Sequence, residues 1–578
     1  MAIGWAFIGT GRYPDRVGAP GMALAGDTEL IATYSRDRGR AQAFAEKHGA
    51  ASAYDSLDDL LKDSKVDAVF IASPNSLHSQ HALQAARAGK HVLSEKPMTT
   101  TLEDAVAMVR GCRDNGVKLG AGYHLRTHPG HIMAQRLIAE GALGHIAMAQ
   151  AQWGFGVRGS GGPPPRTGLR LWWDDPELIG GASTMMGTGV HAVDLLTGEL
   201  RWTTTIEDHP ASRITGAPAL HDGRLYVPVA SLEELSAADP RYECCTFRGS
   251  VVALDAATGE RIWKTYVIRE SPQPTRTNSA GTQNHGPSGA GVWSAPTLDP
   301  ARNLLYVATG DAYSDPAAVE SDAIVALTMD TGEIQWVRQT TPGDAFTIAC
   351  VGAGLFGLPG SDNPIMRANC PESEGPDFDY GSSPILITRN GDDLLLSGQK
   401  SGVMYGIRPE DGEIVWETRV SDGGLIGGIE WGFATDGNDV FVSISDTIEK
   451  PPGEAGGVTA LRVDDGEVVW HAPPVQDTCG GREGCHTGQP AAMTLIPGVA
   501  FAGSLDGHLR AHATDTGQMI WDFDTAAQFR TVNGVEGRGG SINGPGPTVV
   551  DGMVYVVSGY GSFGFMPGNV LLAFGVED

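Results

Sequence analysis

The sequence contains no uninterrupted run of about 20 apolar residues, the length that an α-helix needs to cross a bilayer. It is also poor in positive charge, because 41 Lys and Arg stand against 69 Asp and Glu, which gives a net charge of −28. Such an excess of acid repels phosphate backbones and anionic lipid headgroups. We therefore expect neither nucleic acid nor a membrane surface as a partner.

The amino terminus lacks the charged region and small-residue cleavage site of a secretory signal, since residues 1–9 run directly into an apolar segment. We therefore expect the chain, as written, to stay in the cytoplasm. The haem-attachment motif C-x-x-C-H is missing too, because Cys485 and His486 lack the first cysteine. Any electron acceptor is thus expected to be a separate molecule.

Cysteine is scarce in the first half, where Cys112 stands alone, but the second half holds six cysteines. An even number is typical of a disulfide framework formed in an oxidising compartment. The short spacing of Cys479 and Cys485 favours a local pair, and Cys350 with Cys370 is a second expected pair. Two alternatives stay open: six small buried side chains without disulfides, and a periplasmic location.

The first half alternates strands and helices in the manner of a nucleotide-binding α/β fold. Residues 3–8 and 29–34 are predicted strands, and Gly9, Gly11 and Arg12 follow the first of them. Glycines at such a position let a pyrophosphate approach the backbone N–H groups of a helix N-terminus. The pattern continues with helices predicted at 56–62 and 79–88 and strands at 67–72 and 90–94.

The end of the second strand bears on the choice of nucleotide. It runs into Ser35 and Arg36 and not into the acidic residue that would hold a ribose 2′-hydroxyl. The arginine favours the 2′-phosphate of NADP over NAD. A solvated loop arginine without a nucleotide role is the alternative.

Three motifs connect the first half to a known family: S-P-N-S-L-H at 73–78, E-K-P at 95–97 and G-V-H-A-V-D at 189–194. With them, residues 1–196 resemble the Gfo/Idh/MocA oxidoreductases, named after glucose-fructose oxidoreductase and inositol dehydrogenase. The resemblance implies a Rossmann domain at 1–122 with Asn75 and Glu95 on the cofactor side. It also implies that Lys96 positions the reacting hydroxyl and that His191, on a helix, accepts its proton.

Two departures from that family limit the expected activity. Gly187 stands where many members carry an aspartate four residues before the histidine. The second domain, at residues 123–196, lacks the broad antiparallel sheet that the family would continue with. We expect weak NADP binding and little or no turnover of a sugar or polyol.

The second half, residues 197–578, repeats a phrase of the form T-G-E-x-x-W. Its six copies end at Trp202, Trp263, Trp336, Trp416, Trp470 and Trp521. The spacing fits one four-stranded propeller blade per copy, with each tryptophan wedged against the neighbouring blade. We predict an all-β propeller of about six blades, closed by the segment 197–206 acting as the outer strand of the last one.

The propeller half also carries a rare pair of adjacent cysteines, Cys244 and Cys245, followed by Arg248. With this pair and the repeats, residues 197–578 resemble the pyrroloquinoline quinone (PQQ) dehydrogenases, especially the polyvinyl-alcohol-dehydrogenase-like branch. The resemblance implies that the cysteine ring stacks on one face of PQQ and Trp293 on the other. Arg248 would bind the quinone's carboxylates.

The same resemblance places further residues around the quinone. Lys400 would lie beside the ortho-quinone, where a cation polarises the accepting carbonyl, and Trp431 belongs to another cofactor-side segment. Asp311 and, less directly, Glu234 would offer oxygens to Ca²⁺. The catalytic aspartate of the family's T-P-x-D-x-W-D segment is replaced by Thr347, and Asp344 is the remaining acid that could serve as the base.

These observations predict a multidomain oxidoreductase: an α/β Rossmann domain with a truncated partner domain, followed by a PQQ-type propeller. We expect oxidation of an alcohol, sugar or polyol with PQQ and Ca²⁺ in the propeller and NADP or NAD in the first half. Two alternatives stay open. The propeller can serve as a non-catalytic binding or assembly module, or the fusion can be accidental with neither site complete.

Overall fold

The computed structural model describes residues 2–122, 132, 136, 189–193, 200–351, 367–389, 391–532, 536–559 and 561–575. By their internal contacts the described residues fall into two units, one holding residues 2–122 and the other residues 189–193 and those from 200 onward. None of the described helices combines the length and the apolar character needed to span a bilayer.

The first unit is a six-stranded parallel sheet of order β3-β2-β1-β4-β5-β6. Its strands are β1 (Ile3–Ile8), β2 (Thr28–Tyr34), β3 (Ser52–Tyr54), β4 (Ala68–Ile71), β5 (His91–Ser94) and β6 (Leu119–Ala121). The order reverses between β1 and β4, and the crevice at such a switch point is where doubly wound sheets bind nucleotides. The predicted Rossmann domain is confirmed.

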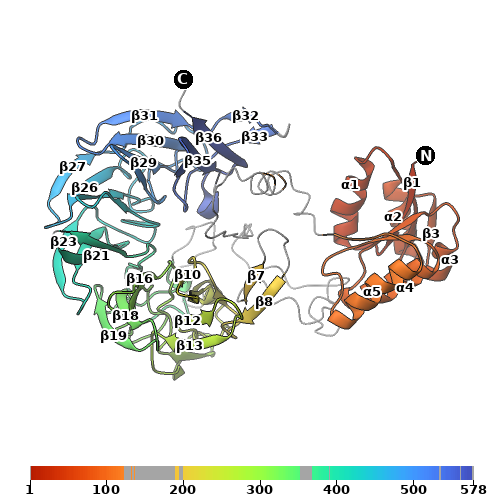
Figure 1. Cartoon of the computed structure of the whole chain (residues 1–578), viewed down its shortest axis with the longest axis horizontal. Helices are drawn as coiled ribbons and strands as arrows, with labels where there is room; N and C mark the ends of the chain where they lie inside the picture. The colour runs from red at the N-terminus through yellow and green to blue at the C-terminus, as the bar shows by residue number, and fades with distance from the viewer. Residues whose placement is uncertain are drawn as a thin grey trace. The chain divides into compact units, whose positions relative to one another are not determined.

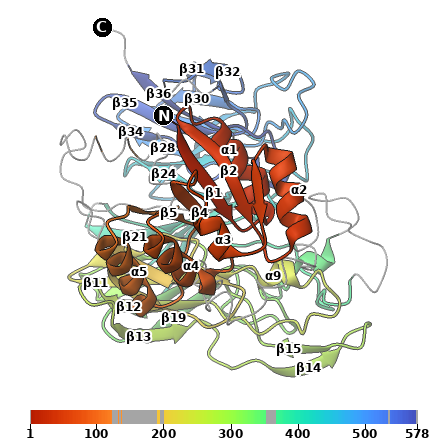
Figure 2. The same ribbon diagram turned by 90° about the vertical axis from the view of Figure 1, so that its right-hand side faces the viewer.

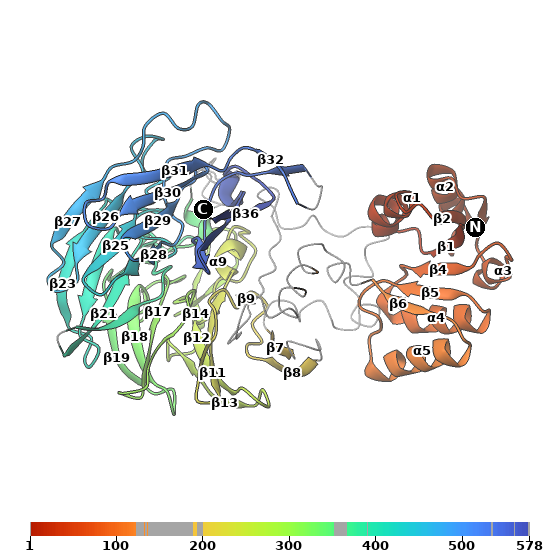
Figure 3. The ribbon, with the colours of Figure 1, turned by 45° about the horizontal axis from the view of Figure 1, so that its top comes forward.

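Helices cover both faces of this sheet (Figures 2 and 3). They are a π-helical turn, η1 (Pro14–Gly18), which leads into α1 (Ala19–Ala23), then α2 (Arg38–His48), α3 (Leu57–Leu61), α4 (His78–Arg87) and α5 (Leu102–Asp114), with a 3₁₀ turn, η2 (Asn75–Leu77), before α4. Side chains alternate along a strand, so Ala6 and Ile8 pack with α3, α4 and α5, whereas Phe7 packs with α1 and α2. The helices α3 and α4 lie within two residues of their predicted positions.

The second unit consists of antiparallel sheets that follow one another around a propeller (Figure 1). Five contain four strands in consecutive order and are called blades 1 to 5, and in the first of them a further short strand pairs with the second strand. Blade 1 is β10 (Ala219–His221), β11 (Arg224–Ser231), β12 (Ser250–Asp255) and β13 (Arg261–Tyr266); blade 2 is β16 (Thr297–Asp299), β17 (Leu304–Ala308), β18 (Ala323–Thr328) and β19 (Ile334–Gln339). Blade 3 is β20 (Ile385–Arg389), β21 (Asp392–Gly398), β22 (Val403–Ile407) and β23 (Ile414–Arg419); blade 4 is β24 (Ala434–Thr435), β25 (Asp439–Ser443), β26 (Val458–Arg462) and β27 (Val468–Ala472).

Blade 5 and the remaining elements complete the unit. Blade 5 is β28 (Thr494–Ile496), β29 (Val499–Gly503), β30 (His508–Ala513) and β31 (Met519–Asp524), and β34 (Thr548–Val550), β35 (Met553–Ser558) and β36 (Val570–Gly575) form a three-stranded sheet. Outside the blades lie β9 (Ser212–Arg213), which pairs with β11, the hairpins β14 (Gln273–Thr277)–β15 (Gln283–Gly286) and β32 (Gln528–Arg530)–β33 (Glu536–Arg538), a helical turn α9 (Glu233–Ser236), and the 3₁₀ turns η5 (Ile348–Cys350) and η7 (Ser562–Gly564).

The predicted role of the tryptophans is confirmed. In blades 1 to 5 the phrase joins the third and fourth strands. Five of the six tryptophans donate the indole N–H to a backbone carbonyl of the next blade, whereas Trp521 packs against Phe574. Trp263 donates to Met329 O at 3.0 Å and Trp416 to Val463 O at 2.8 Å. Buried tryptophans that find an acceptor add a directional bond to their large apolar contact. The repeated phrase therefore both turns the chain and fastens neighbouring blades.

The predicted closure of the propeller is wrong in one respect. The segment from Leu200 to Thr205 forms β8, which pairs antiparallel with β7 (Gly189–Val193) and not with β36. Trp202 still docks on blade 1, with its indole N–H 3.0 Å from Ala256 O. The chain thus enters the propeller with β7 and β8, which correspond to the third and fourth strands of a blade. Because β7 is already the partner that β8 requires as an outer strand, β8 does not pair with β36.

The same hairpin corrects a second expectation. His191 was predicted on a helix, but it lies in β7, where its backbone is in register with Thr203. Alternating apolar residues from Gly189 to Val193 fit a strand before a T-G-E turn better than a helix. Apart from residues 132, 136 and 189–193, the predicted second domain at 123–196 lies outside the described residues.

A glycine in these turns is needed for space as well as for conformation. Gly332 has a φ of +72°, and a Cβ there would lie 2.5 Å from Trp263 Cε3. Gly223 has nearly the same φ, +73°, but a Cβ there meets no atom within 4 Å. We expect Gly223→Ala to cost about 1–2 kcal/mol of left-handed strain. Gly332→Ala should cost a further 1–3 kcal/mol, roughly, from overpacking.

Thermal unfolding followed by tryptophan fluorescence checks this pair of variants. The Gly223→Ala variant is the matched control for backbone conformation. Equal melting temperatures for the two variants would contradict the packing role of the glycine against the tryptophan.

Candidate active site

An acidic centre lies among the loops at one end of the propeller. Antiparallel order places the loops that enter each blade, and those that join second and third strands, at the end opposite the T-G-E turns. Asp311 follows β17, Asp377 and Asp379 precede β20, and Lys400 follows β21. Carboxylate oxygens of the three aspartates lie within 4.8 Å of one another.

Lys400 is the positive charge of this centre. Its Nζ donates to Asp377 Oδ1 at 3.3 Å and to Asp379 Oδ2 at 3.1 Å. Asp379 also accepts the backbone N–H of Asp311, which fixes the loop of blade 2 to the loop of blade 3. All four residues are buried, and neither carboxylate oxygen of Asp311 has a hydrogen-bond partner among the described residues.

The pKa values reflect crowding of like charge in a dry site. Burial, followed by the charges of Asp379 and Asp377, raises the pKa of Asp311 well above its usual range. Burial raises the pKa of Glu234 and of Glu430 to about 7 each. Three buried aspartates around a single lysine leave a surplus of negative charge, and hard cations prefer such oxygens.

Trp293 borders this centre. A Cβ at Gly310 would lie 2.5 Å from Trp293 Nε1 and 2.6 Å from Asp379 Oδ1, so the strand end must carry a glycine there. The indole nitrogen of Trp293 has no hydrogen-bond partner among the described residues. Buried indole N–H groups usually find an acceptor, so this donor can serve a ligand that binds beside the acidic centre.

The adjacent cysteines Cys244 and Cys245 form a disulfide, as the sequence resemblance implied. Glu233, which is fully buried in α9, holds the segment around them. It accepts the hydroxyl of Tyr242 at 2.9 Å and the backbone N–H of Phe247 at 2.8 Å, one from each side of the pair. The next residue, Glu234, lies close enough to the acidic centre for its charge to act on Asp311.

Removing the Glu233 carboxylate should loosen this segment. Burial alone would raise the pKa of Glu233, but His209, 3.3 Å away, and the N–H groups outweigh it and hold the pKa below the usual value. A depressed pKa adds stability above the unfolded value near 4, roughly, and this stability is lost as the pH falls through the folded value. We expect Glu233→Ala to cost about 3 kcal/mol at pH 7 and less at pH 3, which lies below the unfolded value.

Thermal melting at the two pH values measures this effect. Glu243→Ala provides the control, because Glu243 is exposed on the same loop. A Glu233→Ala variant as stable at pH 7 as the control would show that the carboxylate does not hold the cysteine segment.

Other predicted residues lie where their side chains already have partners. Asp344 accepts the backbone N–H groups of Asp377 at 3.1 Å and Phe378 at 2.8 Å, so it supports the loop that carries two of the acids. Arg248 donates to the carbonyls of Ile268, Arg269 and Glu270 and stacks over Tyr266 at 4.0 Å. The roles of Asp344 as base and of Arg248 as carboxylate ligand stay predictions.

Trp431 is 39 % exposed and donates its indole N–H to Asn543 Oδ1 at 2.9 Å. Thr347, which replaces the family's aspartate, is buried and donates to Asn369 O at 3.2 Å.

Asp377 and Asp379 were missed by the sequence reasoning. Their only signal in the sequence was two acids in the D-F-D segment, and strand alternation does not place their side chains because Asp377 has a left-handed φ of +60°.

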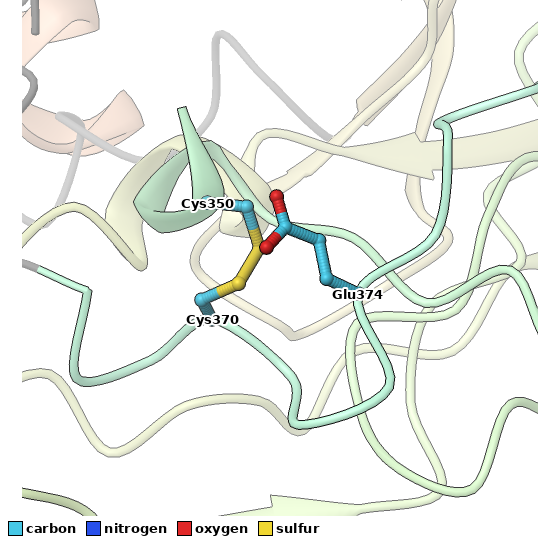
Figure 4. A group of neighbouring side chains, drawn as sticks. All are labelled: Cys350, Cys370 and Glu374. Atoms are coloured by element: carbon cyan, nitrogen blue, oxygen red, sulfur yellow. A yellow bond between two sulfur atoms is a disulfide. The ribbon is translucent and has the colours of Figure 1, made fainter. Parts of the chain in front are cut away.

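The other two predicted disulfides, Cys350–Cys370 and Cys479–Cys485, are confirmed, and Cys112 is a buried free thiol. Figure 4 shows Glu374 beside Cys350 and Cys370. Because the two sulfurs are bonded to each other, they are not thiolate ligands, and Glu374 pairs with Arg367. This group is a structural crosslink and not a metal centre.

The first unit presents its predicted residues around the switch point of the sheet. A Cβ at Gly9, whose φ is +112°, would lie 2.6 Å from Ala72 O, so the loops after β1 and β4 approach closely. Gly11, by contrast, has open space around its Cα. Glu95 accepts the backbone N–H of Lys96 at 3.0 Å, and the Lys96 side chain is exposed.

The nucleotide-specificity segment lies at the end of β2. Arg36 and Arg12 are exposed, whereas Ser35 is buried and accepts the backbone N–H of Asp37 at 3.4 Å. Asn75 is buried at the start of the turn before α4. Lys96 and His191 belong to different units, and their joint role in proton transfer stays a prediction.

Comparison with known proteins agrees with the division of the chain into a Rossmann unit and a propeller unit. Residues 3–123 match the profile of the oxidoreductase family with an NAD-binding Rossmann fold. Residues 205–348 match that of the glucose/ethanol/alcohol dehydrogenase β-propeller domain, and residues 373–571 that of the outer membrane protein assembly factor BamB.

Three relatives show where the halves have counterparts. Polyvinylalcohol dehydrogenases of a Pseudomonas species and of a Sphingopyxis species are 44% and 40% identical, each over 67% of this chain and 60% of their own. The 1,5-anhydro-D-fructose reductase of Ensifer adhaerens is 36% identical over 33% of this chain and 55% of its own. The chain therefore spans 55–60% of the length of these relatives.

The fold and these matches show that the chain consists of two modules. The first has a Rossmann fold similar to the NAD-binding domain of the Gfo/Idh/MocA family, and the second is a β-propeller similar to that of the PQQ-type dehydrogenases. Within the second class, the propeller is related to the polyvinylalcohol dehydrogenases.

Proposed function

We propose that the propeller oxidises a secondary alcohol with bound PQQ and a divalent cation. The observation that carries this proposal is the buried set of Asp311, Asp377, Asp379 and Lys400 next to Trp293. Acids packed around a lysine are costly to bury, and such arrangements cluster at sites of chemistry. The residues fit the cofactors, because among the described residues neither oxygen of Asp311 nor the indole N–H of Trp293 has a hydrogen-bond partner.

Each of the chain's own side chains has a separate role in this reaction. Asp311 and Asp379 would hold the cation, with Glu234 beside them. Asp377 accepts the proton of the alcohol hydroxyl on a carboxylate oxygen, and Lys400, in contact with both of its oxygens, offsets part of the rise in the Asp377 pKa that burial and Asp379 cause. The quinone, when bound, would take up the hydrogen of the carbinol carbon as a hydride, which carries the two electrons of the oxidation. Asp344 holds the Asp377 loop in place through two backbone N–H groups.

The relatives support a class of substrate, and the sequence supports a separate electron acceptor. The named substrate of two relatives is polyvinyl alcohol, a chain of secondary hydroxyl groups, and we propose the same substrate class here. Electrons leave to a separate acceptor. Three disulfides in the propeller support an oxidising compartment as its place of action.

Reconstitution with PQQ and Ca²⁺, followed by reduction of an artificial dye in the presence of polyvinyl alcohol, tests the proposal. We expect cofactor-dependent activity that falls about 10²–10⁴-fold in Asp377→Asn. Absence of any cofactor-dependent dye reduction by the folded wild-type protein would overturn it. The match of residues 373–571 to BamB then favours the second candidate, a non-catalytic assembly module.

For the first half we propose a nucleotide site that prefers NADP. The support is the exposed Arg36 after β2 and the lack of an acidic residue there. Fluorescence titrations with NADPH and NADH measure the preference directly. Tighter binding of NADH, or equal affinities in wild type and Arg36→Ala, would contradict it.

A further inference from the structure

His78 is buried at the start of α4 in the first unit, with 1 % of its surface exposed. Its Nε2 lies 2.8 Å from Ser73 O, and its Nδ1 lies 2.8 Å from Pro97 O. Ser73 belongs to the loop after β4, and Pro97 belongs to the loop after β5. One imidazole ring therefore joins two loops that follow neighbouring strands of the sheet.

The two hydrogen bonds of His78 together require a protonated ring. A carbonyl oxygen can only accept, so each ring nitrogen must donate. A neutral imidazole has a single N–H, and its other nitrogen would direct a lone pair at a carbonyl oxygen 2.8 Å away. The imidazolium ring donates twice, and hydrogen bonds from a charged donor are stronger than those from a neutral one. The geometry thus indicates that His78 is positively charged.

The charge of the ring and the position of the two loops depend on each other. A buried cation is unfavourable unless hydrogen bonds or an opposite charge compensate it, and here two backbone carbonyls do so. If the loops separate, the imidazolium loses one of its two acceptors. If the ring loses its proton, one of the two loops loses its hydrogen bond to the ring.

The titratable and charged groups on the elements around His78 are His81, one turn further along α4, Glu95 and Lys96 before Pro97, Asp104 at the start of α5, and Arg36 after β2. Burial, followed by the charges of His78 and Arg36, lowers the pKa of His81 to about 4, so that this second ring is neutral at pH 7. The other groups are not histidines, and histidine is the side chain that ordinarily changes its charge near neutral pH. A change of charge in this cluster above pH 7 is therefore assigned to His78.

The loops that His78 joins border the crevice of the Rossmann sheet. The order of the sheet reverses between β1 and β4, and doubly wound sheets bind a dinucleotide at such a point. The loops after these two strands approach closely, since a Cβ at Gly9 would lie 2.6 Å from the carbonyl oxygen of Ala72, which precedes Ser73. The loop after β4 thus forms one side of the crevice, and His78 fixes it to the loop after β5.

We propose that His78 is a positioning residue of the nucleotide site, and that its imidazolium form holds the two loops in the arrangement that binds NADPH. The inference rests on the nucleotide site proposed for the first half. Binding is then tighter at pH 7 than at pH 9, because the neutral ring holds only one of the two loops. By linkage, binding of the nucleotide at the higher pH takes up a proton.

Fluorescence titrations of the full chain with NADPH at pH 7 and pH 9 test this role. Both values lie above the second pKa of a phosphate monoester, about 6, so the charge of the nucleotide changes little between them. In wild type we expect binding about tenfold weaker at pH 9, the worth of one hydrogen bond. His78→Gln, whose side chain carries no charge, should be insensitive to the change of pH. His91→Gln, exposed at the opposite end of β5, should behave as wild type.

NMR of the full chain with isotope-labelled histidine measures the charge of the ring without any nucleotide. At pH 7 we expect a histidine with protons on both ring nitrogens, whose signals are missing from the spectrum of His78→Gln. A neutral His78 at pH 7, or equal NADPH affinities of wild type at the two pH values, would overturn the proposal. If neither NADPH nor NADH binds at either pH, the nucleotide site itself is refuted and the role of His78 falls with it, even where the NMR spectrum shows a charged ring.

Discussion

The Lys400→Met variant should lose nearly all alcohol oxidation and a large part of the stability of the propeller. Lys400 contacts Asp377 and Asp379, and burial, which would lower its pKa, is outweighed by these carboxylates. Removing one partner of a buried pair costs about 3–5 kcal/mol, because the other charge stays buried. Loss of a preorganised cation beside the reacting groups lowers the rate about 10²–10³-fold.

A matched control separates the two effects. Lys264 also forms a half-buried pair, 2.7 Å from Glu207 Oε2, but lies in β13, away from the acidic centre. Lys264→Met should lower the melting temperature and leave kcat unchanged. If Lys400→Met kept its activity under conditions where it stays folded, the lysine would have no part in the reaction.

Addition of Ca²⁺ should raise the melting temperature far more at pH 8 than at pH 5.5. Without a cation, burial and like charges raise the pKa of Asp311 and of Asp377 well above their usual range, and burial raises that of Glu430 to about 7. A carboxyl group with a raised folded pKa destabilises the protein as the pH rises above its unfolded value. For Glu430 the shift from 4.5 to about 7 corresponds to roughly 3 kcal/mol.

A bound cation neutralises these carboxylates in place of the protons that they bind at low pH. The free energy of unfolding that the cation adds therefore grows as the pH rises over the same range. At 100 times its Kd, Ca²⁺ adds about 2.7 kcal/mol. Thermal melting with Ca²⁺ or a chelator, at both pH values, gives the effect, and Asp311→Asn should abolish most of it. An equal gain at the two pH values would contradict a cation site made of these acids.

The sequence was informative wherever a local pattern sets the structure. The turn before Trp263 could be predicted because its glycine, its tryptophan and the carbonyl that it meets recur in each blade. Gly9 and the strand before it predicted the Rossmann fold, because a glycine between a strand and a helix is likewise a local pattern. Such features depend on neighbours in sequence and on a repeated packing geometry.

The site was harder to predict because it is assembled from different blades. Asp377 and Asp379 reach Lys400 only through the order of loops at one end of the propeller, which no spacing in the sequence reveals. Arg248 was predicted as a cofactor ligand, yet local carbonyls satisfy its guanidinium. His191 was predicted on a helix because its motif resembles that of the Gfo/Idh/MocA family, and the pairing of β7 with β8 shows that it lies in a strand.

The most direct test of a functional quinone site is the amount of cofactor that the chain retains. Purified, oxidised protein is incubated with PQQ and Ca²⁺, desalted, and analysed by absorbance and by metal analysis. We predict about one PQQ and one cation per chain in wild type. Asp311→Asn should lose the cation. A folded wild-type protein that retains neither would contradict the account.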